Sequence, residues 1–155
     1  LMNGTSASTF SPDAAMTRAM MVTILWRMEK EPAALKSNFT DLTADWYRTA
    51  VDWAAETGVV NGVGNGKFAP NATLSLEQLI TILYRYAENK GYNVSKSASL
   101  DSFTDGSAVS AYARPAMQWA VGMNFLSGNT LTPGAPASRA QIAQVLMLFC
   151  KAYIK

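Results

Sequence analysis

Apolar residues recur in one pattern in three segments of this 155-residue chain. Within each segment they are spaced i, i+3, i+4 and i+7, which places them on one face of an amphipathic helix. The matching positions are Met21, Ile24, Leu25 and Met28 in the first segment, Leu79, Ile82, Leu83 and Tyr86 in the second, and Ile142, Val145, Leu146 and Phe149 in the third. Three equivalent helices predict a mainly α, pseudo-threefold fold around a central three-helix bundle.

Each of these helices follows a short proline motif and begins at a hydroxyl residue. The motifs are Phe10-Ser11-Pro12, Phe68-Ala69-Pro70 and Leu131-Thr132-Pro133, and the hydroxyl residues are Thr17, Ser75 and Ser138. Such residues are good N-caps, and Ser75 and Ser138 also begin capping boxes with Gln78 and Gln141. We therefore interpret residues 1–155 as a single domain of three repeats at 1–35, 36–98 and 99–155, the first comprising only a C-terminal half.

A second helix is predicted before the proline motif in the later repeats. It spans residues 45–57, where Gly58 would end it in a left-handed conformation, and it recurs over residues 112–120 with Pro115 in its first turn. Trp53 and Trp119 hold equivalent positions and are expected in the core. The glycine-rich segment 61–67 predicts a tight turn rather than a phosphate site, because no strand precedes it and no helix follows directly.

The composition excludes several classes of function. The chain has no histidine and a single cysteine, Cys150, which we expect to be buried and inert. These counts exclude a Cys/His metal site and Ser-His or Cys-His catalysis, and the sequence predicts no cofactor. A net charge of +2 without a basic run argues against nucleic-acid binding, and no segment approaches the roughly 20 apolar residues that span a membrane.

The ordered unit Phe39-Thr40-Asp41-x4-Trp46, followed by Gly58-Val59-Val60-Asn61-Gly62 and Gly66-x-Phe68-x-Pro70, resembles an S-layer homology repeat. Thr17-Arg18-Ala19 and Ser138-Arg139-Ala140 resemble the Thr-Arg-Ala-Glu motif of that family. The resemblance covers essentially the whole chain and implies a three-pronged spindle. It also implies a non-catalytic, extracellular module that anchors bacterial proteins to cell-wall polysaccharide, typically pyruvylated secondary wall polymers. Other surface-layer proteins are further expected partners.

The candidate binding residues are Arg18, Arg139, Asp41, Asp45 and Trp46. Arg18 and Arg139 each open a capped helix, where the helix dipole disfavours a cation, so a nearby anion is expected. The guanidinium and free helix N–H groups could bind the carboxylate of a pyruvyl ketal. By pseudo-threefold order, Arg18 is expected to share an inter-repeat groove with Asp41, Asp45 and Trp46. The alternatives are that the arginines pair structurally with Asp41 or Asp105 or with a helix C-terminus elsewhere, and that Trp46 packs in the core.

Departures from the family motif predict unequal grooves. Leu76 replaces the expected arginine in the second repeat, and Glu77 would repel a carboxylate, so this groove should be weak unless Leu76 is changed to arginine. The first repeat lacks its front half, which predicts further chain upstream of Leu1. The site at Arg139 is then expected to be incomplete. The flank of the 142–149 helix is expected to lack cover and to favour self-association. The competing functions are a protein-interaction or surface-lattice module and, from the acidic residues, a wall hydrolase.

Overall fold

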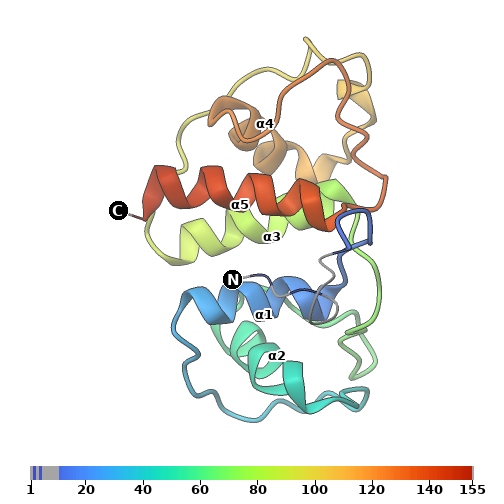
Figure 1. Cartoon of the computed structure of the whole chain (residues 1–155), viewed down its shortest axis with the longest axis vertical. Coiled ribbons are helices and arrows are strands. Elements are labelled where there is room, and N and C mark those ends of the chain that lie inside the picture. Colours follow the sequence, from blue (N-terminus) through green and yellow to red (C-terminus); the bar gives the residue numbers. More distant parts are fainter. Residues whose placement is uncertain (1, 3, 5–10, 155) are drawn as a thin grey trace. The chain divides into compact units, whose positions relative to one another are not determined.

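The computed structural model of the chain describes residues 2, 4 and 11–154. In this part of the chain five α-helices account for the regular structure, with two short 3-10 turns (Figure 1). The elements are α1 (Arg18–Met28), α2 (Asp45–Thr57), α3 (Leu76–Asn89), η1 (Gly106–Ala108), η2 (Ala111–Ala113), α4 (Arg114–Gly122) and α5 (Arg139–Tyr153). Over the same residues β pairing is limited to isolated bridges. The mainly α class is therefore confirmed.

The helix boundaries follow the predicted caps. Thr17, Ser75 and Ser138 each accept a hydrogen bond from a backbone N–H of the first helical turn. Gln78 completes the capping box at Ser75 by accepting from the Ser75 N–H at 3.0 Å. Gly58 ends α2 with a φ of 76°. The helix expected over 112–120 begins as η2 and continues as α4, with Pro115 in the first turn of α4.

The chain divides into two compact units. One includes Met16–Thr73, and the other combines Ser11–Ala15 with residues 74–154. In the first unit α1 packs against α2, and Trp53 of α2 is 6% exposed. In the second unit α3 packs against α4, and an aromatic cluster centred on Trp119 and Phe149 joins α4 to α5. The core positions predicted for Trp53 and Trp119 are confirmed, whereas the central three-helix bundle stays a prediction because α1 and the other two helices belong to different units.

Each central helix begins on the proline turn of another repeat. The first two N–H groups of α1 donate to the carbonyls of Ala72 and Pro70 at 2.9 Å each. The equivalent acceptors are Ala135 and Pro133 for α3, and Ala14 and Pro12 for α5. The pairing thus follows the predicted cyclic order of repeats, and it explains why Ser11–Ala15 belongs with the second unit. Phe10, which opens the first motif, lies outside the described residues.

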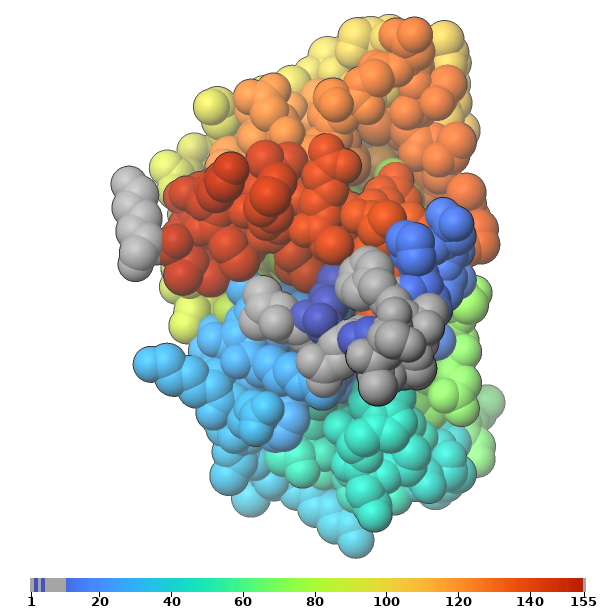
Figure 2. Space-filling model, in the orientation of Figure 1, coloured from blue at the N-terminus to red at the C-terminus, as the bar shows by residue number. Residues whose placement is uncertain are grey.

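The flank of α5 that was expected to lack cover is partly apolar. On the face shown in Figure 2, α5 lies at the surface (red). Met147 of this helix is 49% exposed, and Ile154 just after it is 44% exposed. Self-association through this flank stays a prediction. Among the described residues, none of the helices combines the length and the apolar character needed to cross a bilayer.

Candidate ligand-binding site

Arg18 is fixed by two backbone carbonyls and an aromatic ring. Its Nε donates to the Phe68 carbonyl at 2.9 Å, and one terminal nitrogen donates to the Asn61 carbonyl at 2.7 Å. The guanidinium carbon lies 4.8 Å from the centroid of the Phe68 ring, within the range of a cation–π interaction. We call Arg18, Asp41, Asn61 and Phe68 the Arg18 cluster. It joins the start of α1 to the glycine-rich turn and the proline motif of the second repeat.

The Arg18 cluster holds its cation partly away from water. Burial lowers the pKa of Arg18 from its ordinary value, and the negative charge of Asp41 acts against this shift. An arginine nevertheless stays protonated at neutral pH. The bonds to Phe68 and Asn61 use only part of the donor capacity of the guanidinium. Its other N–H groups can therefore serve an anionic ligand.

The first-turn N–H groups of α1 are already paired. Those of Arg18 and Ala19 donate to the carbonyls of Ala72 and Pro70, and that of Met20 donates to the Thr17 hydroxyl at 3.2 Å. The expectation that free helix N–H groups would help to bind a carboxylate is therefore wrong for α1. The physical reason is that buried backbone donors must be satisfied, and here the proline turn supplies the acceptors. An anion at this site would depend on the guanidinium.

Asp41 holds the proline turn on which α1 begins. Its carboxylate accepts from the Phe68 N–H at 2.9 Å and from the Ala69 N–H at 2.8 Å. Burial acts to raise the pKa of Asp41, but the hydrogen bonds from these N–H groups, together with the charge of Lys67, prevail and lower it. Asp41 therefore positions Phe68, which in turn positions Arg18. Direct contact of Asp41 with a ligand stays a prediction.

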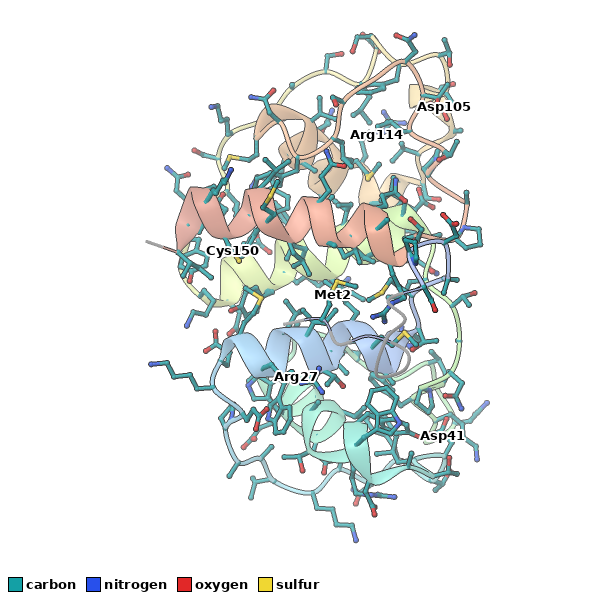
Figure 3. The ribbon with its side chains drawn as sticks, in the orientation of Figure 1. Met2, Arg27, Asp41, Asp105, Arg114 and Cys150 are labelled. Atoms are coloured by element: carbon teal, nitrogen blue, oxygen red, sulfur yellow. The ribbon has the colours of Figure 1, made fainter. Side chains whose placement is uncertain are left out.

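Asp105, labelled together with Asp41 in Figure 3, makes equivalent hydrogen bonds in the second unit. It accepts from the N–H groups of Leu131 and Thr132 at 2.8 Å each, and these bonds lower the pKa of Asp105. The middle residues of all three proline motifs have positive φ although none is glycine. These are Ser11 at 54°, Ala69 at 57° and Thr132 at 47°. The recurrence of Phe-Thr-Asp in the sequence was the available signal for this role, which sequence reasoning missed.

Asp45 and Trp46 occupy the first two positions of α2, in the same unit as Arg18. Both are exposed, and Trp46 remains 52% accessible. The alternative of core packing for Trp46 is therefore wrong. Its indole lies edge-on against the buried ring of Tyr47, with centroids 5.0 Å apart. The Tyr47 hydroxyl accepts from the N–H of Thr43 at 3.0 Å, which fixes the chain just before α2.

Arg139 has a different environment from that of Arg18. It is the first residue of α5 in the second unit and is only 6% exposed. Its backbone N–H donates to the Ala14 carbonyl at 2.9 Å. The equivalence of the two arginines thus extends to the backbone but not to the accessibility of the side chain. A binding role for Arg139 stays a prediction.

The second repeat carries a contact that the sequence did not predict. Glu77, the second residue of α3, is 7% exposed and accepts two hydrogen bonds from Ser110. The Ser110 N–H donates to Oε2 at 2.9 Å and its hydroxyl donates to Oε1 at 2.6 Å. The only sequence signal was that Glu77 occupies a position where Ala19 and Ala140 stand in the other repeats. Leu76, which replaces the expected arginine, is 2% exposed.

Other reactive chemistry is sparse in the described residues. Cys150 is half-buried rather than buried, and burial raises the pKa of its thiol. A raised pKa disfavours the reactive thiolate at neutral pH. In residues 2, 4 and 11–154, His, Cys, Asp and Glu side chains form no group suited to hold a metal ion.

Comparison with known proteins identifies the family. A family model for the S-layer homology domain matches residues 38–80 and 102–143, together more than half of the chain. An endoglucanase from Bacillus sp. (strain KSM-635) is 33% identical over 153 residues, which cover 94% of this chain but 16% of the endoglucanase. The surface-layer 125 kDa protein of Lysinibacillus sphaericus is 30% identical over 152 residues, with coverages of 94% and 12%.

A third relative, a cell surface protein of Thermoanaerobacter kivui, is 33% identical over 92 residues, which cover 55% of this chain and 12% of that protein. The chain thus spans less than a fifth of the length of each of these three relatives. Surface proteins among them indicate a location at the bacterial cell surface, as the sequence predicted. With two segments that match the family model over more than half of its length, the chain belongs to the S-layer homology domain family.

Proposed function

We propose that this domain anchors a surface protein to the bacterial cell wall by binding an anionic, pyruvylated secondary cell-wall polysaccharide, without catalysis. Its family relation supports anchoring, because similar segments occur in proteins named as an endoglucanase and as a surface-layer protein. The similar segment is a small share of each of these chains. A shared module in proteins of different names fits attachment better than it fits a common reaction.

One observation carries the proposal: the guanidinium of Arg18 is held by the carbonyls of Phe68 and Asn61 and by the Phe68 ring. This geometry fixes a cation at the start of a helix, where the dipole disfavours it, and leaves N–H groups for an anion. A guanidinium and a carboxylate form a strong, directional pair. The carboxylate of a pyruvyl ketal is therefore the proposed ligand group.

Trp46 and Asp45 supply the contacts proposed for the sugar itself. The exposed indole of Trp46 offers an apolar face on which the C–H groups of a pyranose ring can pack. The exposed carboxylate of Asp45 can accept hydrogen bonds from sugar hydroxyls. Asp41 contributes by fixing Phe68, and so the direction of the Arg18 side chain.

A titration monitored by NMR tests the proposal. The isotopically labelled domain is titrated with isolated wall polysaccharide and with the same polymer after mild acid has removed its pyruvyl ketals. The intact polymer should shift the indole N–H signal of Trp46 and the backbone signals of Arg18 and Asn61. The acid-treated polymer should bind more weakly by about tenfold to a hundredfold, the contribution of a charge-assisted hydrogen bond of about 1.5–3 kcal/mol.

Substitution of Arg18 tests the residue. Arg18→Ala should weaken binding of the intact polymer by tens-fold, for the same physical reason. Lys36→Ala is the matched control, because it removes one positive charge from an exposed position in the same unit. Equal affinity of Arg18→Ala and wild type, with an unchanged circular dichroism spectrum, would refute the role of Arg18.

The same samples separate the alternative functions. A protein-interaction or lattice-assembly module predicts no spectral response to either polymer. A wall hydrolase predicts that soluble fragments appear during incubation, which chromatography of the polymer would detect. Binding without fragments is the expected result.

A further inference from the structure

The start of α3 and the segment just before and within η2 form a counterpart of the site at Arg18 and Trp46, with different side chains. It combines residues of the second and third repeats, as the site at Arg18 combines residues of the first and second. Arg18 and Leu76 are the first residues of α1 and α3. Trp46 in the second repeat and Tyr112 in the third each precede a core tryptophan by seven positions, and both are exposed, at 52% and 55%. When Arg18 is matched with Leu76, Ala19 corresponds to Glu77. When Trp46 is matched with Tyr112, Ala44 corresponds to Ser110. The two sites therefore share a backbone pattern and an exposed aromatic residue, but differ in charge.

The Glu77–Ser110 pair, here called the clasp, joins the first turn of α3 to the residue before η2. Both carboxylate oxygens of Glu77 accept from Ser110, at 2.6 and 2.9 Å. The carboxylate is nearly buried, so its hydrogen bonds compensate the loss of hydration. At the corresponding positions of the site at Arg18, Ala19 and Ala44 carry methyl groups, which can form no such bond. Of these two sites, only the one at Leu76 therefore has a clasp of this kind.

The clasp fixes a carboxylate on the residue that directly follows Leu76, the counterpart of Arg18. Three effects then oppose an anionic ligand at this site. Leu76 offers no cation, the charge of Glu77 repels a second carboxylate, and the N–H and hydroxyl of Ser110 already donate to Glu77. Opening the clasp would leave a buried carboxylate without these partners, which is unfavourable.

We propose that the Glu77–Ser110 clasp excludes anionic ligands from the site at Leu76 and Tyr112 and directs them to the Arg18 cluster. Glu77 is thus a specificity-determining residue. Its effect adds to that of Leu76, which stands where the family motif has an arginine. This inference rests on the proposed function, since it assumes an anionic polysaccharide. It changes the expectation for Leu76→Arg. A guanidinium introduced at position 76 would lie next to Glu77 and be neutralised by it, so this substitution alone should not create a site.

The test compares three forms of the full chain: wild type, Leu76→Arg, and Leu76→Arg with Glu77→Ala. The probe is the isolated pyruvylated wall polymer, with the acid-treated polymer as reference, and the reporters are the backbone NMR signals of Ser110 and Tyr112. Wild type and Leu76→Arg should show little response at these reporters. The double variant should bind there about tenfold more tightly than Leu76→Arg or better, the effect of one charge-assisted pair.

The reverse transfer tests the same proposal at the Arg18 cluster. Ala19→Glu with Ala44→Ser introduces the clasp at the Arg18 cluster and should weaken the response of the Trp46 indole by about tenfold or more. Ala44→Ser alone is the matched control and should bind like wild type. This second experiment keeps the proposal testable if the Leu76→Arg/Glu77→Ala variant does not fold, as judged by circular dichroism.

The outcomes distinguish the two proposals. Equal binding by Leu76→Arg and the double variant would overturn the role of the clasp, as would undiminished binding by a folded Ala19→Glu/Ala44→Ser variant. If wild type shows no response at Trp46 but the double variant responds at Tyr112, the proposed function at Arg18 fails, exclusion of anions by the clasp stands, and its role in directing ligands to Arg18 is overturned. If no variant binds at either site, both proposals are overturned.

Discussion

Replacement of Asp41 by alanine should destabilise the domain, because this carboxylate holds the proline turn on which α1 begins. The substitution removes the acceptor for the N–H groups of Phe68 and Ala69. An unpaired buried donor costs about 1–3 kcal/mol. Phe68 is buried, but Ala69 and Asp41 are half-buried, so water can satisfy part of this demand. We therefore expect a loss of about 2 kcal/mol in the free energy of unfolding.

Urea unfolding followed by tryptophan fluorescence measures this loss. With a slope of about 2 kcal/mol per molar urea, the midpoint should fall by about 1 M. Asp101→Ala is the control, because Asp101 also lies in a loop and its side chain is exposed. The backbone N–H of Asp101 donates to the Ser99 hydroxyl, and this bond does not involve the carboxylate that the substitution removes. A midpoint for Asp41→Ala within error of that for Asp101→Ala would show that the turn does not depend on Asp41.

Acid should reproduce part of the effect in the wild type. The pKa of Asp41 is lowered in the folded state from its ordinary value of 3.8. A carboxylate with a lowered pKa stabilises the folded state above its unfolded pKa, and this contribution is lost as the pH falls from about 4 through the lowered value. The difference in stability between wild type and Asp41→Ala should therefore shrink as the pH falls below 3.8 and through the lowered pKa of Asp41, and a constant difference over that range would contradict the reasoning.

Three further substitutions have distinct expected results. Gly62→Ala should lower stability by about 1–3 kcal/mol in urea unfolding, because a Cβ there would lie 2.6 Å from Cε1 of Phe39 and 2.8 Å from the Lys67 carbonyl oxygen; an unchanged midpoint would contradict this. Lys30→Gly should raise stability by about 0.5–1 kcal/mol, because Lys30 has a φ of 65° at the end of α1. A lower midpoint would show that the lysine side chain matters more than its backbone. Trp46→Ala should change stability by less than about 0.5 kcal/mol, as for an exposed residue, yet weaken polysaccharide binding in calorimetry.

The helices could be predicted because their signals are local. The apolar spacing, the caps at Thr17, Ser75 and Ser138, and the stop at Gly58 lie within the segments that they define. The cyclic pairing, in which each central helix begins on the proline turn of another repeat, was also predictable, because the recurrence of the motif fixes the order of the repeats. The helices and their pairing thus depend on short stretches of chain and on the symmetry of the repeats.

The contacts of the candidate site could not be predicted in the same way. The partners of Arg18 are the carbonyls of Asn61 and Phe68, and every residue carries a carbonyl, so the sequence holds no signal for them. The pairing of Glu77 with Ser110 joins residues 33 positions apart and depends on the path of the chain into η2. The expectation of free N–H groups at α1 failed for a related reason, because their acceptors come from a distant turn.

The proline turns also bear on how the repeats could be rearranged in evolution or in the laboratory. The start of α1 pairs with the second repeat, that of α3 with the third, and that of α5 with the first. An open array of repeats can gain or lose a unit because each contacts only its neighbours in sequence. In this chain the pairing returns from Arg139 to Ala14, so deletion of any repeat would leave one helix start without acceptors and one turn without a helix. The repeats are therefore interdependent, and three is the number that closes the cycle.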